Sequence, residues 1–151
     1  MRCRCSKKSG GQQAQALGRS RGGFSTKVHI AVDALGNPLR FILTAGQSHD
    51  SPQAEALIEG YSTRALIADK GYDSSDLIEA VKALGIQAVI PPRSNRIEQR
   101  EYDKHLYKER HLVECFINKI KHYRRVFSRF EKLSKNYLGF LSFVSALVWL
   151  R

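Results

Sequence analysis

Residues 24–46 read FSTKVHIAVDALGNPLRFILTAG, and their alternation of polar and apolar side chains decides the fold class of this 151-residue chain. FSTKVHIAVD alternates in the manner of a half-buried strand, and LRFILTAG resumes as a second strand. Between them, DALGNP is rich in turn residues and places Gly36 and Asn37 at the bend. We therefore predict an antiparallel hairpin over residues 24–46, in which Asp33 belongs to the turn.

The chain after the hairpin alternates between amphipathic and apolar segments. In order, these predict a short helix within residues 48–61, a strand over 64–69, a helix over 74–85 and a strand over 87–93. Pro52 suits the first turn of a helix, and Gly85 is typical of a helix end. Unbroken apolar runs are typical of strands buried on both faces. This order predicts an α/β fold, a mixed sheet with helices packed on it.

Residues 107–121, YKERHLVECFINKIK, predict a helix with two ordered faces. At about 100° per residue, Tyr107, Arg110, Glu114 and Lys121 fall within an arc of about 60°. A separate apolar stripe is formed by Val113, Phe116, Ile117 and Ile120. The helix can thus bury one face and present an aligned glutamate beside it. The structural alternatives are an Arg110–Glu114 pair at i to i+4, a core Tyr107 and a solvated Lys121.

The net charge of +11 is unevenly distributed along the chain. Residues 1–27 carry seven Lys or Arg and no acidic residue, residues 28–99 carry six against nine, and residues 100–135 carry eleven against five. Such an excess favours a polyanionic partner, and nucleic acid is the leading candidate. The alternative is a basic protein with no particular ligand. Because residues 1–23 lack hydrophobic periodicity, we predict a flexible basic segment there and one domain over 24–151.

Cysteine content and hydropathy indicate the cytoplasm. Three cysteines are too few and too unevenly spaced for a disulfide scaffold, and none forms a zinc motif. The apolar run over residues 137–150 is shorter than the roughly 20 residues that cross a bilayer, so it predicts a buried helix. The amino terminus has no apolar signal sequence.

Two carboxylates are candidates for metal binding. Asp69 ends the apolar run of residues 64–69, and ligands of open α/β sheets gather at the carboxyl ends of strands. Turn chemistry would also explain Asp69, and Glu114 alone could be a solvated side chain. Together they suggest carboxylates that hold Mg²⁺ or Mn²⁺ for phosphoryl transfer. Asp50 is explained by helix capping, and we leave it out of the catalytic set.

At these residues the chain resembles the catalytic domain of bacterial insertion-sequence transposases of the DDE superfamily. The spacing of Tyr107, Arg110, Glu114 and Lys121 matches that family's Tyr, Arg, Glu, Lys signature, and Asp69 in IADKGYDS matches its second acidic residue. The likeness extends over nearly the whole chain. It implies a ribonuclease H-like fold, with Asp69 and Glu114 as catalytic ligands of Mg²⁺ or Mn²⁺. The implied reactions of DNA transposition and recombination are strand cleavage at element ends and strand transfer to target DNA.

The resemblance also implies partners for the basic side chains. Arg110 and Lys121 would contact DNA phosphates, and Tyr107 would stack on or hydrogen-bond to the strand end. Arg124 and Arg125 continue this basic surface and would contact the backbone of double-stranded DNA. A solvated helix face is an equal alternative for them. The active form is expected to be a homo-oligomer associated with the nucleoid.

The family's first carboxylate has no counterpart in this sequence. It lies on a strand upstream of the segment equivalent to KKSGGQ, and Asp33, the first acidic residue here, is explained by the hairpin turn. We therefore expect an incomplete ribonuclease H-like domain over residues 24–151, truncated so that the first central strand is missing. Alone it would not cleave DNA and would need an upstream-frame polypeptide. The alternatives are a non-catalytic regulator that binds DNA or the transposase, and a decayed remnant.

Overall fold

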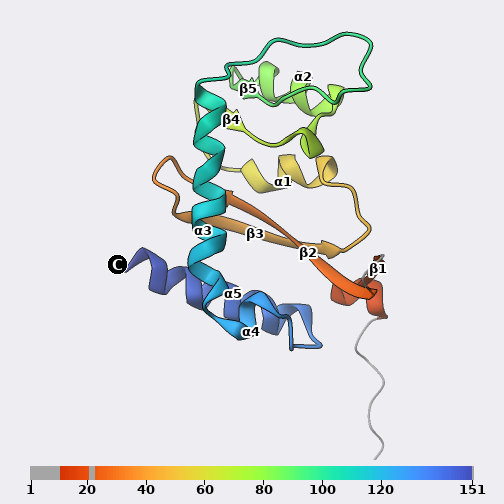
Figure 1. The fold of residues 1–151 in the computed structure, drawn as a ribbon, viewed down its shortest axis with the longest axis vertical. Coiled ribbons are helices and arrows are strands. Elements are labelled where there is room, and N and C mark those ends of the chain that lie inside the picture. Colours follow the sequence, from red (N-terminus) through yellow and green to blue (C-terminus); the bar gives the residue numbers. More distant parts are fainter. Residues whose placement is uncertain (1–10, 21–22, 151) are drawn as a thin grey trace, which may run out of the picture.

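The computed structural model describes residues 11–20 and 23–150, which form small sheets and flanking helices (Figure 1). The strands are β1 (Gly18–Ser20), β2 (Gly23–Val32), β3 (Pro38–Ala45), β4 (Ala65–Ile67) and β5 (Gln87–Val89). The α-helices are α1 (Ala54–Ile58), α2 (Ser75–Ala83), α3 (His111–Lys121), α4 (Arg124–Phe127) and α5 (Ser134–Trp149). The 3-10 helices are η1 (Gln12–Gln15), η2 (Ser51–Gln53), η3 (Lys70–Tyr72) and η4 (Leu106–Arg110).

The predicted hairpin is confirmed as β2 and β3, which pair antiparallel. Asp33 organises the turn, because its Oδ1 accepts hydrogen bonds from the backbone N–H groups of Leu35 and Asn37, both at 2.8 Å. Gly36 has a φ of 81°, in the left-handed region that glycine adopts most readily. The local turn chemistry read from the sequence therefore sets the register of the hairpin.

The predicted mixed α/β character is confirmed, and in the described part of the chain the strands form two small sheets with flanking helices. One sheet has three antiparallel strands in the order β1-β2-β3, and β4 and β5 form a separate parallel pair. β4 was expected to be buried on both faces, but its residues are half-buried. A two-stranded sheet leaves one edge of each strand uncovered, so an apolar run does not guarantee complete burial.

The spacing predicted a single α-helix over residues 107–121, but the structure differs there. Its first turn is the 3-10 helix η4, and α3 follows. Asp103 holds the entry to η4, since its Oδ1 accepts from the N–H groups of His105 and Leu106, both at 2.9 Å. A 3-10 helix has three residues per turn, so Tyr107 and Arg110 still face the same side.

The carboxyl-terminal apolar segment forms α5, but only one face of the helix is buried. Leu141 and Val144 are buried, whereas Phe143 and Trp149 are 62% and 53% exposed. The predicted buried helix is therefore present, but it buries one face only. None of the helices within residues 11–20 and 23–150 is long and apolar enough to cross a membrane.

Part of the predicted flexible segment takes part in the fold. β1 pairs with the start of β2, and Arg129 donates hydrogen bonds to the backbone carbonyls of Gln15 and Ala16. Residues 1–10 and 21–22 lie outside the described residues. The domain boundary predicted at residue 23 remains an expectation.

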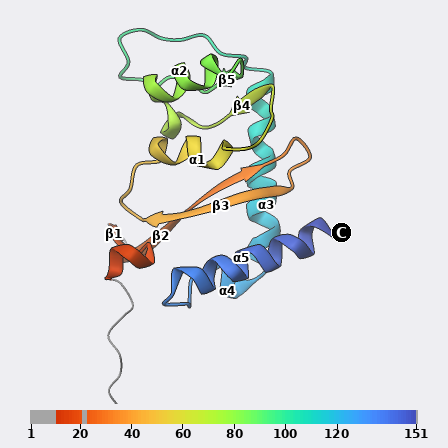
Figure 2. The same cartoon turned by 180° about the vertical axis from the view of Figure 1, so that it is seen from behind.

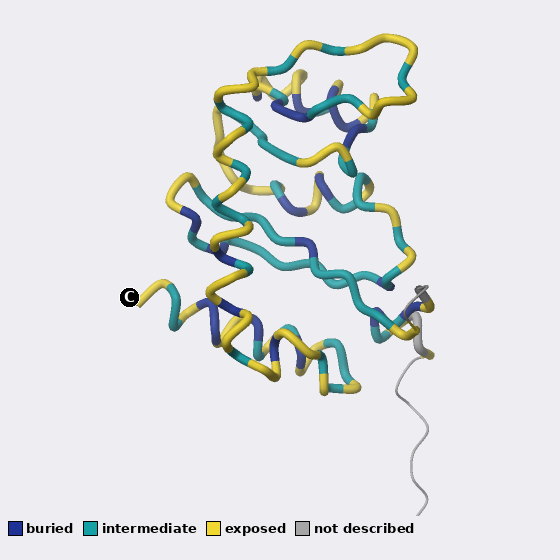
Figure 3. Tube along the Cα trace, viewed as in Figure 1, coloured by how far each residue is buried: buried dark blue, intermediate teal, exposed yellow. Residues whose placement is uncertain are grey.

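Two hydrophobic cores hold the elements together (Figure 3). The first joins α1, α2 and β5 through Ala54, Leu77, Ile78, Val81, Ile86 and Ile90. The second joins α3, α4 and α5 through Phe116, Ile120, Val126, Tyr137, Leu141 and Val144, with β2 and β3 packed against it. The apolar stripe predicted for α3 is confirmed, because Phe116 and Ile120 are buried there.

The hairpin lies between these two cores. Both views show α1 on one side of β2 and β3 and α5 on the other, with α3 running past both sheets (Figures 1 and 2). Val28 and Ile30 of β2 pack on the second core. The alternate residues Lys27 and His29 point to the opposite face of the strand. That face is directed towards η3, the turn that follows Asp69.

Candidate functional site

Asp69 lies just beyond the carboxyl end of β4, where the sequence placed it. It precedes η3 with an extended backbone, and its exposed side chain accepts a 2.8 Å hydrogen bond from the N–H of Gly71. The carboxylate therefore caps its own turn, as the local turn chemistry allowed. One oxygen is engaged in this way, and the group remains accessible to solvent.

A second carboxylate, Asp50, lies on the other side of Gly71. A Cβ placed on Gly71 would be 2.8 Å from Asp69 Oδ1 and 2.9 Å from Asp50 Oδ2, so both oxygens border the same space. The explanation of Asp50 as a helix cap is wrong, since its side chain makes no capping hydrogen bond to η2. The turn from β3 into η2 instead directs this carboxylate towards the Asp69 turn. Sequence reasoning left Asp50 out because it directly precedes the helix that begins at Ser51, where a capping role was sufficient explanation.

Lys27, His29 and Tyr72 surround Asp50. Lys27 Nζ is 3.0 Å from Asp50 Oδ1, and His29 Nδ1 is 3.7 Å from the same oxygen. His29 is buried between Tyr72 Oη at 3.0 Å and Thr44 Oγ1 at 2.8 Å. Burial lowers the pKa of His29, Asp50 opposes that shift and Lys27 adds to it. These contacts join β2 to η3 across the space between the two sheets.

The charges of both carboxylates, Asp50 and Asp69, affect the pKa of Tyr72. Burial raises the pKa of its hydroxyl, and the charges of Asp50 and Asp69 raise it further. A phenolate beside two anions would be unfavourable, so Tyr72 remains a neutral hydrogen-bonding group. Asp50, Asp69 and Tyr72 therefore form one electrostatic unit.

Glu114 is exposed on the first turn of α3 and pairs with Arg110. Arg110 Nη2 donates to Glu114 Oε1 at 2.6 Å, which is the i to i+4 pair considered from the sequence. Burial would lower the pKa of Arg110, but the hydrogen bond and charge of Glu114 raise it, with contributions from Tyr107 and Asp69. Arg110 is thus within electrostatic reach of both acidic residues predicted to be catalytic.

The packing of η4 on β4 brings these residues to the same region. β4 leads directly to Asp69, and η4 leads through Arg110 to Glu114. Within residues 11–20 and 23–150, however, no three His, Cys, Asp or Glu side chains gather in a group that could hold a metal ion. The structure thus brings Asp69, Arg110 and Glu114 towards one another without closing a metal centre.

The remaining signature residues lie on either side of Glu114. Tyr107 is half-buried and stacks edge-on against Tyr102, with 5.5 Å between the ring centroids. Arg110 Cζ is 5.9 Å from the centroid of the Tyr107 ring. Lys121 is exposed at the end of α3, where its Nζ donates to Asn118 Oδ1 at 2.9 Å. Lys121 is therefore available to an anionic partner, while Tyr107 is only partly so.

Arg124 and Arg125 are exposed on α4, beyond the end of α3. Their guanidinium carbons lie 6.0 and 5.9 Å from the ring centroids of Phe130 and Phe140, so each cation also covers an aromatic side chain. Arg129, which follows α4, has a structural role. Its guanidinium donates to backbone carbonyls and contacts the Thr26 hydroxyl, and burial lowers its pKa.

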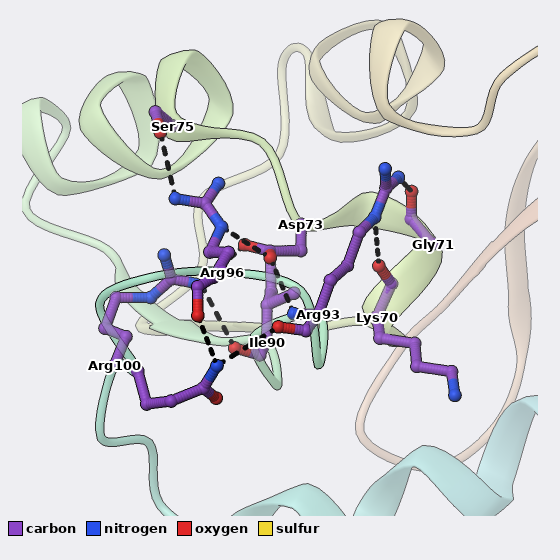
Figure 4. Close-up of polar contacts among 9 residues, drawn as sticks. Lys70, Gly71, Asp73, Ser75, Ile90, Arg93, Arg96 and Arg100 are labelled. Atoms are coloured by element: carbon purple, nitrogen blue, oxygen red, sulfur yellow. Dashed lines mark hydrogen bonds and ion pairs between the residues drawn. The ribbon is translucent and has the colours of Figure 1, made fainter.

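A cluster of arginines holds the turn that follows Asp69 (Figure 4). At its centre is Asp73, whose carboxylate is fully buried. Asp73 Oδ2 accepts from the Arg93 N–H at 2.8 Å and from Arg96 Nε at 2.7 Å, and Oδ1 accepts from Arg100 Nη2 at 2.8 Å. A buried carboxylate with this many donors is stably ionised. These hydrogen bonds fasten the loop that follows β5 to the end of η3.

Arg93 adds a direct link from this loop to the Asp69 turn. Its Nε donates to the Lys70 carbonyl at 3.2 Å and its Nη2 donates to the Gly71 carbonyl at 2.9 Å (Figure 4). Gly71 in turn donates its N–H to the Asp69 carboxylate. The strand predicted over residues 87–93 ends at Val89, so Arg93 lies in the loop after β5, and the sequence offered no way to identify its partner.

The donor set suits a hard divalent cation. Asp50, Asp69 and Glu114 supply carboxylate oxygens, which are the ligands that Mg²⁺ and Mn²⁺ prefer. Because Gly71 has no side chain, the space bordered by Asp50 and Asp69 stays free of carbon. Asp69 and Asp50 could therefore hold an ion from the sheet side, and Glu114 could approach it from α3 after release from Arg110.

Comparison with known proteins identifies a family. Residues 4–149 match the model of the transposase DDE domain. The chain is 42% identical over 131 residues to a Brucella ovis protein named as a transposase for insertion sequence element IS6501, covering 85% of this chain and all of that protein. It is 32% identical to a Burkholderia cepacia protein named for element IS402, covering 82% of this chain and 62% of that protein. No solved structure matches significantly.

Proposed function

Because the chain belongs to the DDE transposases of bacterial insertion sequences and functions in DNA transposition, we propose that Asp69 and Glu114 are catalytic metal ligands of a ribonuclease H-like domain. The observation that supports this proposal is the packing of η4, which leads into the helix that carries Glu114, on β4, which leads to Asp69. A bound Mg²⁺ or Mn²⁺ ion would activate the attacking oxygen and stabilise the leaving one. The reactions are strand cleavage at element ends and strand transfer to target DNA.

Arg110 has two roles in this proposal. Without DNA its Nη2 donates to Glu114 Oε1 at 2.6 Å, which neutralises the glutamate charge. A phosphate that entered the site would compete for the planar guanidinium, which binds phosphate oxygens bidentately. Glu114 would then be free for the metal. Tyr107 would position the strand end, and Lys121, Arg124 and Arg125 would contact the flanking backbone of double-stranded DNA.

We also propose that an upstream segment completes the site. Among the described residues, β2 beyond Ser25 pairs only with β3, and β4 pairs only with β5. Each of these strands therefore has a free edge, which is a ready place for another strand to pair. A strand that joined the two sheets would be the family's first central strand and would supply its first carboxylate. The active assembly would be a homo-oligomer on DNA.

The test is metal-dependent cleavage of DNA that carries the element end. The chain would be supplied with and without the polypeptide encoded upstream, in Mg²⁺ and in Mn²⁺. We expect cleavage only when the chain and the upstream polypeptide are both present with a metal ion. Asp69→Asn and Glu114→Gln should each abolish cleavage and retain DNA binding. Glu109→Gln, which alters an exposed glutamate on η4, is the matched control and should cleave normally.

Two results would contradict this proposal. Cleavage by the chain alone that is lost in Glu114→Gln would remove the need for an upstream segment. Cleavage that survives both Asp69→Asn and Glu114→Gln would exclude these residues as metal ligands.

A second candidate function is a non-catalytic regulator that binds DNA or the transposase. The Arg110–Glu114 ion pair favours it, because the glutamate is already neutralised without a metal. Salt-dependent DNA binding with no metal-dependent cleavage under any condition would support this function.

A further inference from the structure

We propose that Arg93, seated by Asp73, is a positioning residue that holds the Asp69 carboxylate in the orientation required for metal binding. This inference rests on the proposed function of Asp69. It concerns η3, a single 3-10 turn with two backbone hydrogen bonds of its own, at 3.0 and 3.2 Å, and hydrogen bonds in such helices have poor geometry. Asp69 is exposed on it, so the rigidity of its side chain depends on what fixes the turn from outside.

The positioning contacts form a continuous chain. The buried Asp73 carboxylate accepts the backbone N–H of Arg93 at 2.8 Å and so fixes where the Arg93 side chain begins. The guanidinium then donates to the carbonyls of Lys70 and Gly71, at 3.2 and 2.9 Å. The Gly71 N–H donates to Asp69 Oδ1 at 2.8 Å. The two backbone polar groups of Gly71 are thus both engaged, the carbonyl by Arg93 and the N–H by Asp69.

Arg93 differs from its neighbours in the cluster. Arg96 and Arg100 place their guanidinium groups on the Asp73 carboxylate, so they stabilise the loop itself. The Arg93 side chain contacts only backbone carbonyls of the Asp69 turn among the described residues, and it lies at the surface (Figure 4). Removing its guanidinium therefore leaves every contact to Asp73 intact. A substitution of the Arg93 side chain can therefore test the orientation of Asp69 without removing the contacts to Asp73 that stabilise the fold.

Charge and positioning predict opposite effects on metal affinity. Arg93 is a cation near the Asp69 turn, so its removal should strengthen cation binding if charge alone matters. If Arg93 orients Asp69, its removal should weaken binding, as happens when partners that orient metal ligands are lost. Whether metal affinity rises or falls when Arg93 is replaced therefore distinguishes the charge effect from the positioning effect.

The experiment measures Mn²⁺ binding to the full chain by electron paramagnetic resonance, together with hydrogen exchange of the Gly71 amide by NMR. In Arg93→Met we expect Mn²⁺ to bind about tenfold more weakly. The Gly71 amide should exchange several times faster, and the thermal midpoint should be unchanged. Arg93→Lys, which keeps the charge but cannot bridge two carbonyls as arginine does, should show the same weakening. Arg64→Met, at an exposed arginine before β4, is the control and should match the wild type.

Each other outcome is decisive. Unchanged exchange of the Gly71 amide in Arg93→Met would overturn the positioning role, as would unchanged or tighter Mn²⁺ binding. If the wild-type chain does not bind Mn²⁺, or if Asp69→Asn binds it equally well, the inference about Arg93 fails, whereas the proposed function is decided separately by the cleavage assay with the upstream polypeptide. Loss of binding in Asp69→Asn but not in Arg93→Met would retain the proposed metal site and reject Arg93 alone.

Discussion

Replacement of Asp73 by asparagine tests how much stability the arginine cluster contributes. The substitution keeps the shape of the side chain and removes its charge, so one acceptor oxygen becomes an amide that faces the arginine donors. A hydrogen bond to a charged group contributes roughly 1.5–3 kcal/mol, and removing one partner of a buried pair costs about 3–5 kcal/mol. Asp73 is fully buried, but the Arg96 and Arg100 side chains are 29% and 25% exposed, so water can replace part of what they lose.

We therefore expect Asp73→Asn to lower the free energy of unfolding by about 3 kcal/mol. For a domain of this size, that corresponds to a fall in Tm of about 6–12 °C. Circular dichroism melting and urea titration at pH 7 would measure it. Asp76→Asn is the control, because Asp76 is exposed in the first turn of α2 and should cost only about 0.3–1 kcal/mol through the helix dipole.

The same substitution predicts a pH dependence. Burial would raise the pKa of Asp73, but hydrogen bonds from Arg100, the Arg93 N–H and Arg96 outweigh burial and lower the pKa below its ordinary 3.8. A carboxylate with a lower pKa in the folded state stabilises the protein above its unfolded pKa. That stabilisation is lost as the pH falls through the pKa that the carboxyl group has in the folded state. The stability gap between wild type and Asp73→Asn should therefore narrow as the pH falls from about 5 to about 3. The reasoning would be refuted if wild type and Asp73→Asn had equal unfolding midpoints at neutral pH. It would also be refuted if the difference in their stability increased at acidic pH.

Further substitutions test the site, the core and the basic surface. Gly71→Ala should weaken Mn²⁺ binding about tenfold, because the new Cβ would displace the carboxylates of Asp69 and Asp50, and titration with Mn²⁺ would measure it. Phe116→Ala should lower the free energy of unfolding by about 3–5 kcal/mol, measured by urea titration, since Phe116 is fully buried. Lys121→Met should reduce the slope of log affinity for DNA against log salt concentration by about 1, as expected for one lost phosphate contact.

Matched controls separate these effects from general damage. Gly139→Ala has open space around the new Cβ and should bind Mn²⁺ normally. Phe143→Ala removes an exposed ring from α5 and should cost far less stability than Phe116→Ala. Lys82→Met, on α2, should leave the salt slope of DNA binding unchanged. A control that behaved like its partner substitution would contradict the structural reason given for that partner.

The sequence by itself determined the local elements and the family. The hairpin was predictable because its turn is built from Asp33, Gly36 and Asn37, whose preferences act within a few residues. The apolar stripe of α3 was predictable because periodicity reports which face is buried. Asp69 and Glu114 could be proposed as metal ligands because the residues around each resemble a family pattern, and the comparisons show the family itself. All of these signals are local in the chain.

Only the tertiary structure decided which distant residues meet. Asp50 read as a helix cap because its neighbours resemble a helix start, yet it faces Asp69 across Gly71. Asp73 and Arg93 lie twenty residues apart, and no periodicity links a buried carboxylate to a loop that follows the next strand. The pairing of β4 with β5 alone was also decided by the tertiary structure, since the residues of a strand indicate a preference for pairing but not which strand becomes its partner. Pairing and burial are long-range, so they depend on the whole arrangement of elements rather than on any one segment.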